Sequence, residues 1–162
     1  MRLKRITYRG GIAEFELPAN WKEEYADEGG GTFYEDRPDS GTLRLNVLSF
    51  EGPETITAAD MVRTVFRPEA GMQDEDFQDG LRLRTYIAPA TEGGESLSIY
   101  RWHVAVPVAP RSLRVVIFAH TILSGQERDD SIAQELKIID SSVRSGMYSR
   151  EAGVSGPYQH AN

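Results

Sequence analysis

The sequence contains no cysteine, which excludes disulfide bonds, thiolate catalysis and thiol-based zinc sites. No apolar run is long enough to span a bilayer, and the charged start MRLKRITYRGG lacks the apolar segment that follows in a signal peptide. Positive charge is also scarce, because 18 Lys and Arg residues stand against 25 Asp and Glu residues, a formal net charge of −7. This balance argues against general nucleic-acid binding. We therefore expect a cytoplasmic protein with no nucleic-acid or membrane partner.

Motifs for catalysis, metal binding and cofactor binding are missing as well. The glycine-rich EGGGTFYED leads into a predicted strand, whereas a phosphate-binding loop opens a helix. The acidic segment from Asp74 to Gly80 places Asp79 where a calcium loop needs glycine, so we expect a solvated acidic loop there. No two of the three histidines have the spacing of a helical metal site. We expect no catalytic residue, no cofactor and no metal site.

The length and the apolar pattern predict one domain. A chain of 162 residues can bury a core without covalent links. We predict a single domain over residues 1–145 and a flexible tail over residues 146–162, which shows no periodicity. IAEFELP alternates as a half-buried strand does, and GTFYED and TLRLNVLSF predict a hairpin joined by RPDSG, with Gly41 at positive φ. Further strands are predicted over 81–88, 97–106 and 113–123, the last of them central because it is so apolar.

Two helices complete the predicted fold. Thr57 and Asp60 have the spacing of an N-terminal cap, ahead of a short helix that ends before Pro68. A second helix is expected to begin near Ser131, with Gln134 as a reciprocal cap. One apolar stripe of this helix faces the sheet: Ile132, Leu136, Ile139 and Val143. The order of elements predicts an α+β fold with a single antiparallel sheet of about six strands, flanked by two amphipathic helices.

The turns between the last three strands predict which side chains share a face. Gly93 and Gly94 suit a two-residue turn, and a longer loop around PVAPR would set Pro107 opposite Ser112. In this register two histidines share a face but lie on the order of 13 Å apart, too far for a dyad. The apolar side chains then gather on one face. The opposite face carries the candidate binding residues Arg82, Arg84, Tyr86, Arg101, His103, Arg114, Phe118 and His120.

This cationic and aromatic face has two interpretations. Guanidinium groups and rings on one surface can hold an anionic ligand or an acidic partner segment. The alternative is an ordinary polar sheet face, in which acids from the first half of the chain, such as Glu14 and Glu16, neutralise the arginines. Both interpretations stay open from the sequence.

Four segments carry a resemblance to a known superfamily: FELPANW, SGTLRLNVLSF, IYRWHVAV and the closing amphipathic helix. Over residues 6–145 the chain resembles the PsbP-like superfamily, which includes the photosystem subunit PsbP, a Ran-binding release factor, the bacterial protein DcrB and chaperones of secreted effectors. The resemblance implies an antiparallel sheet with flanking helices and a role in holding another protein or a peptide. It supplies no catalytic motif.

We therefore expect a non-catalytic cytoplasmic binding module, such as an adaptor, a chaperone or an immunity-like protein. It would hold a protein or peptide partner, acidic in character, on a face or an edge of the sheet. One alternative is a small enzyme that acts on an anionic small molecule through Arg101 and His103. Another is a homodimer in which the sheet face is the interface.

Overall fold

The computed structural model describes residues 1–152, which form ten strands and two α-helices. The helices are α1 (Ala58–Thr64) and α2 (Asp130–Ser145), and two 3-10 turns, η1 (Arg9–Gly11) and η2 (Gln126–Arg128), accompany them. The strands are β1 (Leu3–Tyr8), β2 (Ala13–Pro18), β3 (Trp21–Tyr25), β4 (Gly31–Glu35), β5 (Thr42–Glu51), β6 (Gln73–Phe77), β7 (Leu81–Glu92), β8 (Glu95–Val108), β9 (Ser112–Leu123) and β10 (Met147–Tyr148).

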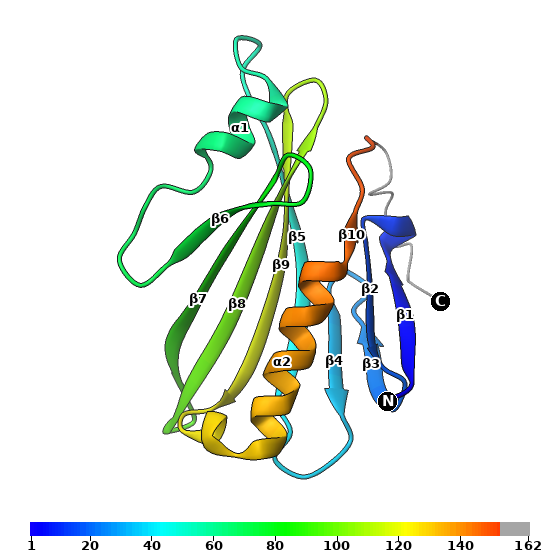
Figure 1. Ribbon diagram of the computed structural model, residues 1–162, viewed down its shortest axis with the longest axis vertical. Helices are drawn as coiled ribbons and strands as arrows, with labels where there is room; N and C mark the ends of the chain where they lie inside the picture. Colours follow the sequence, from blue (N-terminus) through cyan, green and yellow to red (C-terminus); the bar gives the residue numbers. More distant parts are fainter. Residues whose placement is uncertain (153–162) are drawn as a thin grey trace.

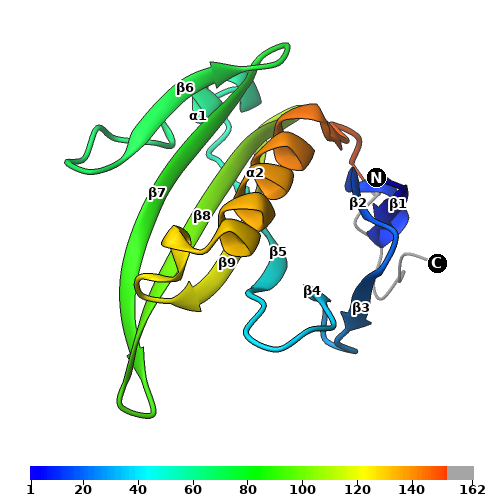
Figure 2. The same cartoon turned by 60° about the horizontal axis from the view of Figure 1, so that its bottom comes forward.

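Within residues 1–152 these strands form two antiparallel sheets, so the prediction of a single sheet of about six strands is wrong. The larger sheet has seven strands in the order β3-β4-β5-β9-β8-β7-β6, and the smaller has three in the order β1-β2-β10. Helix α2 and the small sheet lie on one side of the large sheet, and α1 lies near one end of its strands (Figures 1 and 2). Strand β9 is the middle strand of the seven, as its apolar sequence predicts.

The additional strands include the segment that we expected to be a solvated acidic loop. Residues Gln73–Phe77 form β6, in which Asp74 lies opposite Arg84 and Asp76 opposite Arg82. Aspartate and glutamate are unfavourable in isolated strands, and here the arginines of β7 supply the cross-strand partners that stabilise them. The strand is therefore specified by its neighbour rather than by its own sequence.

Both helices form where they are expected. The capping box of α1 is confirmed, since Thr57 accepts from the amide of Asp60 and the Asp60 side chain accepts from the amide of Thr57. The apolar stripe of α2 is confirmed as well: Ile132, Ile139 and Val143 are buried, and Leu136 packs partly against the same core. The N-cap of α2 is Asp129, however, so the predicted cap at Ser131 is wrong.

The large sheet has a core on each face. The inner core lies between the sheet and the layer made by α2 and the small sheet, with Phe33, Leu45 and Phe118 at its centre. A smaller outer core lies under α1, where Val62 and Phe66 pack against Leu113, Val115 and Ala105. Because β9 contributes to both cores, its sequence is apolar at consecutive positions.

The two turns that set the predicted register have different outcomes. The Gly93–Gly94 turn is confirmed, with Glu92 opposite Glu95. The next connection is one residue shorter than expected, and Val108, not Pro107, lies opposite Ser112. A one-residue change in register moves every side chain of a strand to the other face relative to its neighbour. The prediction therefore assigns the side chains of β9 to the wrong faces.

The first residues of the predicted tail contact the rest of the domain. Met147 and Tyr148 form β10, which pairs with β2, and the Tyr148 hydroxyl donates to the carbonyl of Val143 at 2.6 Å. The guanidinium of Arg114 then donates to the carbonyls of Ser149 and Glu151. The rest of the predicted tail, residues 153–162, lies outside the described residues. No helix in residues 1–152 is long and apolar enough to cross a membrane.

Candidate functional site

The predicted cationic and aromatic face is divided between the two sides of the sheet. The outer face, which α1 covers in part, carries Arg82, Arg84, Tyr86, Arg101 and His103. Three residues of β9 lie on the inner face instead, because of the one-residue difference in register: Arg114, Phe118 and His120. The two histidines assigned to that face, His103 and His120, therefore lie on opposite sides of the sheet and form no dyad. The grouping of all eight residues on one surface is wrong.

On the outer face, Arg84 is a structural residue. It is only 7% exposed, its Nε and Nη2 atoms donate to the two carboxylate oxygens of Asp74 at 2.6 and 2.9 Å, and its guanidinium lies over the Phe66 ring. The hydrogen bonds from Arg84 lower the pKa of Asp74. Neighbouring Arg82 donates to the carbonyl of Arg63. The acids that neutralise this face come from β6, rather than from Glu14 and Glu16.

The rest of the outer face carries a histidine with a lowered pKa and one guanidinium that has no partner among residues 1–152. The Tyr86 hydroxyl lies 3.4 Å from Nε2 of His103, and the two rings meet edge to face. Burial, followed by the charges of Arg101 and Arg84, lowers the pKa of His103 to about 4. Arg101 lies opposite Tyr86 and makes no hydrogen bond or ion pair with residues 1–152.

We expect His103 to stay neutral in the folded protein until the pH falls to about 4. The unfolded chain takes up this proton near the ordinary value of 6.5, so the unfolded state binds more protons between these values. The free energy of unfolding should therefore fall as the pH is lowered from 6.5 towards 4, and His103→Gln should reduce that slope. Nitrogen-detected NMR of the imidazole measures the pKa directly. A pKa near 6.5 in the folded protein would contradict the burial of this ring.

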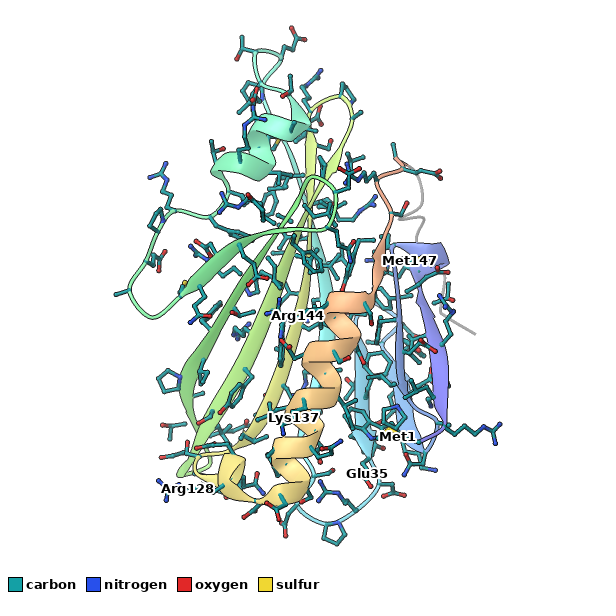
Figure 3. All side chains as sticks on the ribbon, in the orientation of Figure 1. Met1, Glu35, Arg128, Lys137, Arg144 and Met147 are labelled. Carbon is teal, nitrogen blue, oxygen red and sulfur yellow. The ribbon has the colours of Figure 1, made fainter. Side chains whose placement is uncertain are left out.

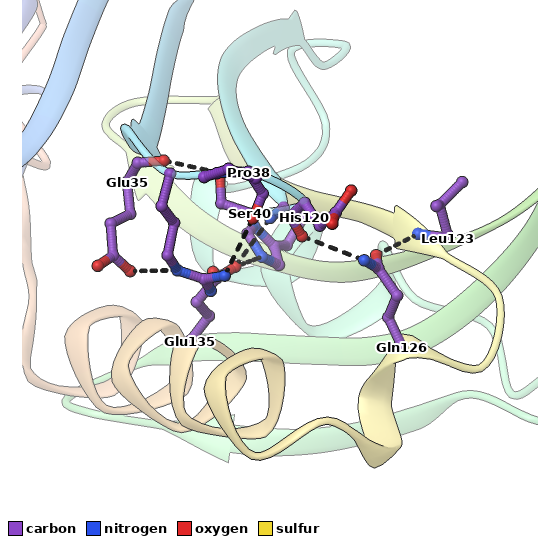
Figure 4. A network of polar contacts seen from close by, with 10 residues as sticks. Glu35, Pro38, Ser40, His120, Leu123, Gln126 and Glu135 are labelled. Atoms are coloured by element: carbon purple, nitrogen blue, oxygen red, sulfur yellow. Dashed lines mark hydrogen bonds and ion pairs between the residues drawn. The ribbon is translucent and has the colours of Figure 1, made fainter.

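On the inner face, His120 belongs to a buried polar network (Figure 4). Its exposed fraction is 0%, and its Nε2 lies 2.9 Å from Oε1 of Glu135, which is itself only 2% exposed. The same oxygen accepts from the amide of Gly41 at 3.0 Å, and the other oxygen pairs with Arg37. Arg37 also pairs with Glu35 at 2.9 Å. The network joins α2 to β9 and to the β4–β5 turn.

The close packing of this network explains Gly41. Its φ is not positive, and the residue at positive φ in the turn is Asp39, at 62°, which corrects the prediction. A Cβ atom on Gly41 would lie 2.7 Å from Cε1 of His120 and 2.9 Å from Cγ2 of Ile122. The glycine is therefore needed for the approach of the histidine ring, rather than for the turn.

A groove lies between α2 and the inner face of β7 and β8. It has a volume of about 650 Å³. Figure 2 shows the far ends of β7 and β8 extending past α2, and Figure 3 places Lys137 and Arg144 along that helix. We call this feature the α2–β8 groove; its lining is Gly71, Gln73, Thr85, Tyr86, Ile87, Tyr100, Arg101, Trp102, Leu136, Lys137, Asp140, Ser141 and Arg144.

Strand alternation decides which side chains reach the α2–β8 groove. Tyr100 and Trp102 of β8 share the inner face with Ile87 of β7, and Ile87 is 57% exposed. Tyr86 and Arg101 border the same cavity, but their side chains belong to the outer face because successive side chains point to opposite faces. On the strand side, the groove wall is therefore mostly aromatic and aliphatic.

A chain of polar contacts fixes the end of the groove at the C-terminus of α2. Nε1 of Trp102 donates to Asp140 at 3.0 Å, and Nε of Arg144 donates to the same carboxylate. Arg144 also pairs with Glu75 of β6 at 2.7 Å, which joins the helix to the edge of the large sheet. Each of these charges has an opposite charge within hydrogen-bonding distance. Lys137 is exposed and has no such partner among the described residues.

The positions of Arg101 and His103 bear on the enzyme hypothesis. That hypothesis expects a pocket on the face that carries both side chains, whereas the groove lies on the other side of the sheet. Within residues 1–152 no group of three or more His, Asp or Glu residues is arranged to hold a metal ion.

No family model matches the chain, so the resemblance to the PsbP-like superfamily stays a prediction. An 82-residue stretch is 33% identical to part of the potassium-transporting ATPase ATP-binding subunit of Xanthomonas campestris pv. campestris; it covers 50% of this chain but only 12% of that protein. A crystal structure from Bacteroides thetaiotaomicron VPI-5482 is similar with a TM-score of 0.63 and 15% identity, over 92% of this chain and 49% of the other. LpqN of Mycobacterium tuberculosis, described as involved in cell envelope biogenesis, is similar with a TM-score of 0.54 and 13% identity, over 80% of both chains. At these identities the two structures show the fold alone.

Proposed function

We propose that the protein is a binding module that holds a segment of a partner protein in the α2–β8 groove. The observation that carries this proposal is the groove itself, a cavity of about 650 Å³ with an aromatic and aliphatic wall. Sites of this size that combine apolar walls with a few polar groups are typical ligand-binding sites. Thr85, Tyr100 and Ser141 supply such polar groups, because their hydroxyls make no hydrogen bond with residues 1–152.

The geometry favours the face of the sheet over its edge. Strand β7 runs from residue 81 to residue 92, but β6 pairs with it only over residues 81–85, so its later residues have a free edge beside the groove. Pro89 lies in this free part and has no amide hydrogen to offer an added strand. A partner strand could therefore pair with only a short part of the edge, whereas the inner face offers the apolar side chains of Ile87, Tyr100 and Trp102.

We propose that the protein is cytoplasmic, in keeping with its cysteine-free sequence. The described role of LpqN in cell envelope biogenesis makes the envelope the alternative location. Cell fractionation distinguishes the two locations. Light scattering distinguishes a monomeric binding module from the homodimer hypothesis.

Crosslinking from two matched positions tests the groove directly. Ile87, in the groove, and Leu48, on the outer face, are both large aliphatic residues with exposed fractions of 57% and 47%. We expect benzoylphenylalanine at position 87 to crosslink a partner in living cells, whereas the same group at position 48 should not. Ile87→Ser should weaken binding of that partner about tenfold or more, as the loss of a central apolar anchor does, and Leu48→Ser should leave the affinity unchanged.

Thermal unfolding of both serine variants checks that each is folded. A partner captured from position 48 alone, or from neither position, would contradict a binding site in the groove.

A further inference from the structure

Most charged side chains of α2 around the α2–β8 groove pair with other residues, whereas one cation of this helix makes no ion pair with residues 1–152. Asp140 accepts from both Trp102 and Arg144, and Arg144 also pairs with Glu75. Arg144 therefore pairs with two carboxylates, and the three charged groups together carry one excess negative charge within the protein. Lys137, one turn of α2 before Asp140 and Ser141, lines the groove with no anionic partner among the described residues.

We propose that the groove selects a partner segment that carries an acidic side chain beside an apolar one, with the acid held by Lys137. This inference rests on the proposed function and names the chemistry of the segment that the groove accepts. An isolated ammonium at the rim of an apolar groove attracts a carboxylate and repels a cation, so it discriminates between partners more than it adds affinity.

The arrangement of the lining residues gives the order of the two groups. Leu136 packs partly against the core and faces the groove across from Ile87 and Tyr100, so an apolar side chain fits between the helix and the strands. Lys137 follows Leu136 directly and is exposed at the rim. An acidic neighbour of the bound apolar residue therefore lies within reach of the ammonium group on its flexible stem.

A carboxylate in η2, outside the groove lining, lies near enough to one lining residue to influence its charge. Glu127 in η2 acts on Tyr100, whose pKa is raised by burial and by this carboxylate. Oε2 of Glu127 is buried and has no hydrogen-bond partner among the described residues. An acidic side chain is disfavoured near Glu127 and favoured near Lys137, so the acidic part of the segment should lie towards Lys137.

The outer face does not supply this selectivity. Arg101 also has no partner among the described residues, but its side chain lies on the other side of the sheet from the groove wall. Arg101→Ala should therefore leave the selectivity of the groove unchanged, whereas substitutions at Lys137 should alter it.

A displayed library of random peptides tests the inference without knowledge of the natural partner. The full chain should enrich peptides with an aromatic or aliphatic residue next to Asp or Glu, about two- to fivefold over matched peptides with Lys or Arg at that position, the size expected for an exposed ion pair. Lys137→Glu should reverse this preference. Lys22→Glu makes the same change in net charge on β3, which lies at the opposite edge of the large sheet from β6, and should retain the preference for acids.

The outcomes separate the two proposals. Enrichment of apolar peptides without a preference for acids, or an equal effect of Lys137→Glu and Lys22→Glu, would overturn the role of Lys137 and leave the groove as the binding site. If the native chain enriches no peptides beyond those that Ile87→Ser enriches, the proposed function itself fails.

Discussion

Glu135→Ala is expected to lower the free energy of unfolding by about 3–5 kcal/mol, the usual cost of removing one member of a buried charged pair. Glu135 accepts from the amide of Gly41 and from His120, and it pairs with Arg37. Its loss leaves the amide and the imidazole without acceptors in a place that water does not reach, since His120 is fully buried. The α2 helix also loses its polar connection to the β4–β5 turn.

Urea unfolding followed by circular dichroism measures this loss. The neighbouring Gln134 is exposed and makes no hydrogen bond among the described residues, so Gln134→Ala is the matched control on the same helix and should change stability by less than about 0.5 kcal/mol. Glu135→Gln keeps an acceptor for Gly41 while it removes the charge, so its cost should fall between the two. Equal stability of the two alanine variants would show that the network does not hold α2 to the sheet.

The sequence could have indicated this network, although the prediction missed it. Glu135 is three residues after Ile132 and four before Ile139, so it lies within the apolar stripe of α2. His120 lies within the most apolar strand of the chain. The apolar pattern assigns both the carboxylate and the imidazole to the core. Because buried polar groups need hydrogen-bond partners, the two are expected to pair with each other.

The sequence predicts those parts of the fold whose local chemistry allows one solution. Consecutive glycines at positions 93 and 94 fix a two-residue turn and with it the pairing of β7 and β8. The capping box at Thr57 and the stripe of α2 are similarly determined by spacing. In each case a few neighbouring residues carry the information, so the prediction requires no knowledge of distant parts of the chain.

The register of β9 could not be predicted because this strand is buried on both faces. Val115 faces the outer core under α1, whereas Val116 and Phe118 face the inner core. A strand covered on both sides has no alternation between apolar and polar residues, and alternation is what fixes register. The prediction assumed one apolar face and one polar face, so it selected the pairing that best separated apolar from polar side chains.

The groove was beyond prediction for a different reason. The residues that line it on α2 and those that line it on β7 and β8 are at least 30 residues apart in the chain, and its position depends on how far β7 and β8 extend past α2 (Figure 2). The helix does carry a signal: Lys137, Asp140 and Arg144 form a charged stripe beside the apolar one. The sequence does not show whether such a stripe faces solvent or borders a cavity.

Arg84→Ala is the second substitution with a large expected effect, about 3–5 kcal/mol on the free energy of unfolding. Arg84 makes two hydrogen bonds to Asp74 and one, of 2.5 Å, to the carbonyl of Arg67, and it stacks on Phe66. These contacts hold β6 and the segment after α1 against β7. Removal of the guanidinium leaves the Asp74 carboxylate without its main partner in a poorly solvated place.

Arg101→Ala is the control, because Arg101 lies on the same face, on the adjacent strand, and has no partner among residues 1–152. It should change stability by less than about 0.5 kcal/mol. Arg84→Lys should retain only part of the stability that Arg84→Ala loses, since an ammonium cannot make the two parallel hydrogen bonds that a guanidinium makes. Urea unfolding at neutral pH measures the free energy of unfolding of all three variants. The opposite result would be a free energy of unfolding equal to that of the native chain together with a loss of binding to the partner protein. In that case Arg84 is a binding residue, and the outer face, not the groove, is the functional surface.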